Sequence, residues 1–171
     1  MTLRRLRLVN PHNLSEAPLT AARPEEGGTM KVAFATHDLH HVDAHFASAR
    51  TFMLFEVSAD HHTLLEAVQF DSVSDEDGVH AAEDGEDRLS AKIEALDGVA
   101  LLFVRAIGGP AAARVVRRMV HPIKLSEPEP ISQVISRVQA MMKGSLPPWL
   151  RKVMQRVDAG PARFVDEEKP A

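Results

Sequence analysis

The sequence predicts a single α/β domain built on a mixed five-stranded sheet flanked by helices, and three observations lead to this prediction. Short apolar runs at residues 31–36, 51–57 and 63–70 have the length of strands. A longer apolar run at 99–107 follows a helical pattern, as in a strand that is covered on both faces. Apolar residues also recur at helical spacing near the carboxyl end. With 171 residues, the chain is long enough to bury a sizeable core.

The domain is expected to span residues 30–157, with its last helices included. Residues 1–29 contain three prolines and the pair Gly27-Gly28 without sustained periodicity, so we expect a mobile extension there. Residues 158–171 are expected to form a flexible tail. No apolar run reaches the roughly 18 residues of a membrane span, and no apolar stretch follows the first arginines as in a secretory signal. A cytoplasmic protein is therefore expected.

The first half of the domain is expected to contain three strands. The run at 31–36 is bounded by polar residues and suits a buried strand, followed by a histidine-rich loop at 37–48. The runs at 51–57 and 63–70 are separated by a short polar segment, which predicts an antiparallel hairpin. The acidic, glycine-containing stretch at 71–85 is expected to be a flexible insertion.

A helix and a central strand are expected next. Residues 87–96 place leucine and isoleucine at helical spacing, and Asp97-Gly98 offers a stop. The apolar run at 99–107 then forms a strand covered on both sides. Gly108-Gly109-Pro110 turns the chain into a helix at 111–120, where proline is accepted in the first turn.

The carboxyl end of the domain is expected to add one strand and two helices. Residues 122–125 suit an edge strand, and residues 131–143 repeat isoleucine, valine and methionine at helical spacing up to Gly144. Pro147-Pro148 opens a final helix that ends near residue 157.

The composition excludes some kinds of chemistry and suggests a charge asymmetry. The chain has no cysteine, which excludes disulfides, thiolate metal sites and cysteine nucleophiles. Residues 56–97 hold 13 acidic residues against two basic ones, and residues 105–156 hold 10 basic residues against two acidic ones. If the fold keeps these segments on different faces, the basic face would attract an anionic ligand or an acidic partner. A pair of solvated faces is the alternative.

Three segments resemble the domain shared by nitrogenase iron–molybdenum cofactor biosynthesis proteins, and specifically the NifX-type carriers. The first is MKVAFAT at 30–36, which leads to VDAHF at 42–46. The second is IGGPAAARVV at 107–116, followed by HPIK at 121–124. The third is KGSLPPWLRK at 143–152. The order of these motifs is more specific than any one of them.

The resemblance covers roughly residues 30–156 and implies both a fold and a function. It implies a ribonuclease-H-like arrangement without nuclease activity. It also implies a carrier, not an enzyme, that stores and transfers iron–sulfur precursors of the iron–molybdenum cofactor, or the cofactor itself. The implied partners are maturation scaffold and cluster-synthesising proteins, with apo-nitrogenase as a further candidate, and neither nucleic acid nor a membrane. One departure is Ala47, where the family often has glycine.

His45 is the first candidate ligand. It lies in the VDAHF run between Asp43, which we expect to fix its tautomer, and Phe46, which we expect to anchor the loop by burial. The resemblance implies that the corresponding histidine is a candidate ligand of the cluster. An imidazole that only hydrogen-bonds within the loop is the alternative. His37, His41 and His45 are spaced by four and would share one face of a helix, but Val42 and Phe46 favour a loop.

The turn at Gly108-Gly109 is the candidate for an anion-binding second half of the site. Glycines directly before a helix expose backbone N–H groups beside a positive dipole end, and Arg114 would add positive charge. Close packing between strand and helix is an equally simple reason for these glycines. The full set of candidates for cofactor binding is His45, His37, Gly108, Gly109 and Arg114, with His45 as the metal ligand.

A second function remains open from the sequence. Without cysteine the chain cannot hold a cluster through thiolates, and a protein that binds no metal would look the same. The alternative is therefore an interaction module that stabilises apo-nitrogenase or a maturation scaffold and contacts metal only through its partner.

Overall fold

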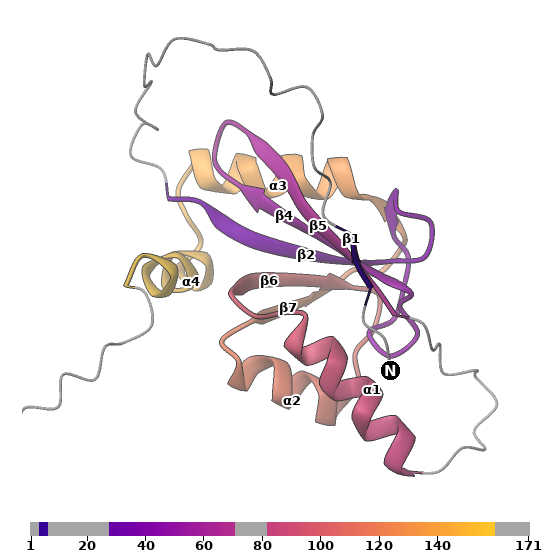
Figure 1. Ribbon diagram of the computed structural model, residues 1–171. Helices are drawn as coiled ribbons and strands as arrows, with labels where there is room; N and C mark the ends of the chain where they lie inside the picture. The colour runs from indigo at the N-terminus through magenta and orange to yellow at the C-terminus, as the bar shows by residue number, and fades with distance from the viewer. Residues whose placement is uncertain (1–3, 7–27, 71–81, 160–171) are drawn as a thin grey trace, which may run out of the picture.

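The computed structural model describes residues 4–6, 28–70 and 82–159, which form a mixed sheet with helices on both faces (Figure 1). In chain order, the elements are β1 (Arg4–Leu6), β2 (Met30–Thr36), β3 (His41–Val42), β4 (Thr51–Val57), β5 (His62–Gln69), α1 (Ala82–Glu94), β6 (Val99–Val104), α2 (Gly109–Arg117), β7 (His121–Lys124), β8 (Glu129–Pro130), α3 (Ile131–Lys143) and α4 (Pro148–Ala159). The predicted mixed α/β sheet flanked by helices is confirmed. The ribonuclease-H-like arrangement implied by the resemblance stays a prediction.

The main sheet has the order β1-β5-β4-β2-β6-β7. Strands β2, β4 and β5 are antiparallel neighbours, and β4 and β5 form the predicted hairpin. Strand β6 pairs parallel with both β2 and β7. Parallel neighbours need a crossover, and α2 supplies it between β6 and β7. β6 is buried along its whole length and lies between β2 and β7, and β7 lies at the edge, as the sequence pattern predicted.

Two cores lie on opposite faces of this sheet. Along β2, Ala33 and Ala35 point into the core under α1 and α2, whereas Val32 and Phe34 point into the core under α3 and α4. Figure 1 shows α1 and α2 together on one side of the sheet and α3 on the other. The rings of Phe34 and Phe103 stack with centroids 5.4 Å apart, which joins the neighbouring strands β2 and β6 within the second core.

The amino-terminal segment adds a sixth strand that the sequence did not predict. Within residues 1–29, Arg4–Leu6 pairs antiparallel with β5 and occupies the sheet edge, so the prediction of an extension without structure is wrong for these residues. A three-residue strand is too short to show alternation, and its place is set by the free edge of β5. The rest of the expected extension, apart from residues 28 and 29, lies outside the described residues.

Two other predicted boundaries move. Helix α1 begins at Ala82, so residues 82–85 belong to a helix and not to a flexible insertion, and residues 71–81 lie outside the described residues. Helix α4 continues to Ala159, two residues into the expected tail. The stop at Asp97-Gly98 is confirmed, and Gly98 has a φ of 71°, which glycine adopts without strain.

A second, two-stranded sheet was also missed. β3 and β8 pair antiparallel, with His41 opposite Pro130. The backbone N–H of Ile131 then donates to the carbonyl of His40 at 2.8 Å. This small sheet fastens the loop after β2 to the start of α3.

The acidic and basic segments are not kept on different faces of the sheet. Helix α1 from the acidic segment contacts α2 from the basic segment, and both cover the same face. The condition for a separate basic face is therefore not met by α1 and α2, because the chain returns to the side of α1 after β6. Among the helices of the described residues, none has the length and apolar character to cross a membrane.

Candidate functional site

His45 is exposed on a short loop whose backbone is fixed to the end of β6. The N–H of Arg105 donates to the carbonyl of Ala44 at 2.9 Å, and the N–H of Phe46 donates to the carbonyl of Ala106 at 2.8 Å. Both neighbours of His45 are buried, while its own side chain is in solvent. The loop therefore presents one imidazole between two anchored positions.

Phe46 anchors this loop in the core, as expected from the sequence. Its side chain is only 1% exposed and lies 5.6 Å from the ring of Phe52, measured between centroids. The N–H of Ala49 donates to the carbonyl of His45 at 2.9 Å and closes the turn. Because the Phe46 ring is buried against Phe52 of β4, a strand of the main sheet, the loop has a rigid base.

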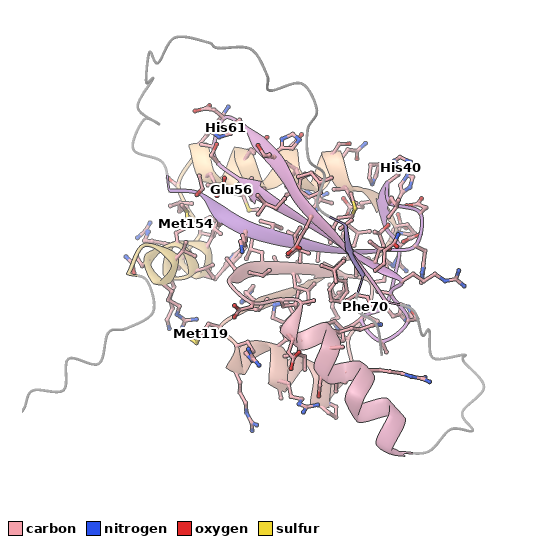
Figure 2. All side chains as sticks on the ribbon, in the orientation of Figure 1. His40, Glu56, His61, Phe70, Met119 and Met154 are labelled. Atoms are coloured by element: carbon pink, nitrogen blue, oxygen red, sulfur yellow. The ribbon has the colours of Figure 1, made fainter. Side chains whose placement is uncertain are left out.

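Lys92 of α1 binds the same loop from the side. Its ammonium donates to the carbonyl of Phe46 at 3.0 Å and to the carbonyl of Ala47, and it lies 5.3 Å from the centre of the Phe70 ring. Figure 2 shows Phe70 at the end of the sheet, on the side of α1. Burial of this side chain and the nearby charge of Arg88 lower the pKa of Lys92 to about 8.

A cavity of about 260 Å³ adjoins this loop. Ala47 lies on one side, Arg88 and Lys92 of α1 on another, and Gly108 at the start of α2 on a third. Two buried arginine nitrogens have no hydrogen-bond partner among the described residues. They are Arg88 Nε and Arg105 Nη1. Arg88 and Lys92 line the cavity among mainly apolar residues, and because the ammonium of Lys92 is already hydrogen-bonded to the loop, Arg88 is the lining cation that can meet an anionic ligand.

Gly108 and Gly109 leave open space at the amino terminus of α2. A Cβ built at either position would meet no atom within 4 Å, so close packing between strand and helix does not explain these glycines. No side chain caps the helix, and its first turn has no acidic residue. Its first N–H groups stay available to an anion, and the macrodipole favours negative charge there.

Arg114 is not part of this cavity. It lines a different cleft of about 290 Å³ between α1 and α2, together with Glu94, Arg117 and Arg118. More than one turn of helix separates the start of α2 from Arg114, which lies near Ser90 and Glu94 at the carboxyl-terminal end of α1. The structure thus brings Gly108 together with Arg88 and Lys92 and places Arg114 in a separate cleft.

The other histidines do not share a helix face with His45. Residues 37–45 form bends, the short strand β3 and extended chain, so the loop that the sequence favours is confirmed and the alternative helix with His37, His41 and His45 on one face is not formed. His37 is exposed, and its backbone N–H donates to Asp43 Oδ1 at 2.7 Å. Asp43 thus supports the backbone at His37 rather than the imidazole of His45.

Asp38 organises the remainder of this loop. Its Oδ1 accepts from the backbone N–H groups of His40 and His41, each at 2.8 Å, and His41 Nδ1–H donates to Oδ2 at 2.6 Å. Burial acts to raise the pKa of Asp38, but these hydrogen bonds outweigh it and hold the pKa well below its usual range. In the part of the chain that is described, no three side chains of His, Asp or Glu are grouped to hold a metal ion.

Sequence reasoning missed Lys92 and Arg88, although a signal for Lys92 was present. Leu89, Lys92, Ile93 and Leu96 follow the spacing of one helix face, and the other three are apolar. A lysine at a core position of an amphipathic helix indicates a specific buried contact. Arg88 carries no such signal, because its position on the helix is compatible with solvent.

Comparisons with known proteins give the family of this chain. The family described as dinitrogenase iron–molybdenum cofactor matches residues 28–141. Protein NifX of Sinorhizobium fredii (strain NBRC 101917 / NGR234) is 49% identical over 147 residues, which is 85% of this chain and 91% of that protein. Protein NifX of Rhodobacter capsulatus is 46% identical over 88% of each chain, and protein NifX of Herbaspirillum seropedicae is 41% identical over 85% of this chain and 95% of its own. The chain therefore belongs to the dinitrogenase iron–molybdenum cofactor family, as a NifX-type protein of nitrogenase cofactor biosynthesis.

Proposed function

We propose that this protein binds iron–sulfur precursors of the iron–molybdenum cofactor, or the cofactor itself, and transfers them between cytoplasmic proteins during nitrogenase maturation. The observation that carries the proposal is the exposed imidazole of His45 on an anchored loop beside a cationic cavity. The protein acts here by binding and release and supplies no catalytic group.

A single imidazole suits a transient hold. The chain has no cysteine, so no thiolate binds the cargo. Imidazole is a neutral ligand that also takes up a proton near neutral pH, so the bond between metal and His45 is reversible. An acceptor protein that offers thiolates would therefore remove the cluster.

The charges around the cavity supply the second contact. Iron–sulfur precursors are anionic, and Arg88 lines the cavity with a guanidinium Nε that has no hydrogen-bond partner among the described residues. The free amino terminus of α2 at Gly108 and Gly109 adds backbone donors. The cargo then bridges His45 and the cavity, and His37 is not among the residues that line this cavity.

Anaerobic titration of the purified protein with an extracted cluster tests this function. We expect the wild type to acquire the colour and iron of the cluster and His45→Ala to lose most of its affinity. His61→Ala is the matched control, because His61 is exposed at the hairpin tip, at the opposite end of the sheet from Phe70 (Figure 2). A wild-type protein that stays colourless and free of iron after gel filtration rejects the function.

One observation favours the interaction module as a second candidate. Val116 and Met119 are 54% and 55% exposed beside Arg117 and Arg118 at the end of α2, and Figure 2 shows Met119 at that end of the molecule. An apolar pair flanked by cations would fit an acidic protein surface. A pull-down of a maturation scaffold that survives both cofactor depletion and His45→Ala supports this candidate.

A further inference from the structure

We propose that Lys92 is a positioning residue for His45. Lys92 holds the loop of residues 43–49 in the conformation that presents the imidazole of His45 to the cargo. This inference rests on the proposed function for its purpose. The contact itself is independent of any cargo.

The two hydrogen bonds of Lys92 act on the residues that directly follow His45. The ammonium donates to the carbonyls of Phe46 and Ala47, which belong to consecutive residues of the turn. The hydrogen bonds to Arg105 and Ala106 already fix the backbone on both sides of His45, but they leave residues 47 and 48 without a sheet partner. Lys92 supplies the missing restraint on the far side of the turn.

Packing alone does not require a lysine at this position. Leu89, Ile93 and Leu96 occupy the same face of α1, and an apolar side chain at position 92 would bury equally well without the loss of hydration of a charge. Lys92 is only 2% exposed, so its ammonium gives up nearly all its water. The presence of a lysine in the core is explained by the two hydrogen bonds from its ammonium to the loop of His45.

The position of the ammonium is itself fixed. The Phe70 ring lies 5.3 Å away and packs against the core that includes Phe52 and Phe46. Phe70 in turn follows β5, and its N–H donates to the carbonyl of Arg50 at 2.9 Å. Lys92 therefore connects the loop to α1 through a side chain that has little freedom to move.

Amide hydrogen exchange of the protein without cargo tests the contact. The N–H of Ala49 closes the turn onto the carbonyl of His45, so its exchange rate reports the order of this loop. We expect Lys92→Met to accelerate exchange at Ala49 about tenfold or more and Lys92→Arg, which keeps charged donors, to restore most of the protection. Lys143→Met is the control, because Lys143 is exposed and pairs with Asp60 at 3.0 Å. An unchanged rate at Ala49 in Lys92→Met overturns the proposal.

Cluster titration then tests the link to His45. We expect Lys92→Met to weaken binding about fivefold or more and the double variant with His45→Ala to bind no more weakly than His45→Ala alone. The same loss in both backgrounds would show that Lys92 acts separately from His45, which overturns a positioning role. Should Lys92→Met fail to fold, Lys92→Gln serves in its place. A wild type that binds no cluster rejects the proposed function, and exchange at Ala49 still decides whether Lys92 orders the loop.

Discussion

The ammonium of Lys92 lies 3.0 Å from the carbonyl oxygen of Phe46, 46 residues earlier in the chain. This contact joins the helix before β6 to the loop after β2. As a result, the loop that carries the candidate ligand His45 also lines the cavity, through Phe46 and Ala47. The stability of the protein and the order of its candidate site are therefore linked through the side chain of Lys92, and substitutions of this residue test both.

The pKa of Lys92 predicts how stability changes at alkaline pH. Burial first, and the charge of Arg88 second, lower this pKa from 10.5 to about 8 in the folded protein. Between these values the unfolded chain binds more protons, so the contribution of Lys92 to the free energy of unfolding rises with pH, by up to about 3 kcal/mol.

Urea unfolding of the wild type and Lys92→Met at several pH values measures this contribution. We expect the difference between the two free energies of unfolding to move in favour of the wild type from pH 8 to pH 10. A difference that stays constant over this range would contradict the lowered pKa. Lys143→Met, which removes an exposed lysine, controls for general alkaline effects.

Asp38 predicts that stability also rises with pH, but in the acid range. Its folded-state pKa is lowered by hydrogen bonds from the N–H groups of His40 and His41, so its contribution is fully present above the unfolded value of about 3.9 and is lost as pH falls below it. The carboxylate is 44% exposed, so solvent screening limits the effect to about 1 kcal/mol. We expect the advantage of the wild type over Asp38→Asn in urea unfolding to shrink from pH 5 to pH 2.5; a constant advantage would contradict this.

Gly108→Ser is expected to stabilise the protein. Gly108 is the N-cap of α2 with an extended backbone (φ −70°, ψ 152°), no side chain caps the helix, and a Cβ at this position meets no atom within 4 Å. A serine hydroxyl there can accept from an N–H of the first turn, and serine also restricts the unfolded chain, which together contribute up to about 1 kcal/mol. Thermal unfolding should therefore show a Tm higher by about 2–4 °C, and Ala113→Gly on the exposed face of the same helix should lower it. A lower Tm for Gly108→Ser would mean that this position needs glycine.

Arg88 and Arg114 distinguish the two cationic clefts. Only Arg88 lines the cavity beside the loop of His45, whereas Arg114 lines the cleft between α1 and α2. In anaerobic titrations at low salt we expect Arg88→Gln to weaken cluster binding about fivefold and Arg114→Gln to change it by less than about twofold. A larger loss in Arg114→Gln would move the cargo to the cleft between the helices.

Much of the sheet was predictable because burial leaves a local record in the sequence. The runs that became β2, β4, β5 and β6 are apolar over the length of a strand, and the hairpin follows from their spacing. β1 and the pair β3 and β8 are two or three residues long, so they leave no period to detect. Their places depend on which edges the rest of the fold leaves open.

By itself the sequence determined the α/β fold, the absence of thiolate ligands and an exposed histidine before a buried phenylalanine. Only the tertiary structure decided which cations accompany His45. Lys92 and Arg88 meet Gly108 beside the loop, while Arg114 lies in another cleft. The physical reason is that periodicity records which face of an element is buried, whereas the partner across the core is set by how the crossovers place α1 and α2 against the sheet.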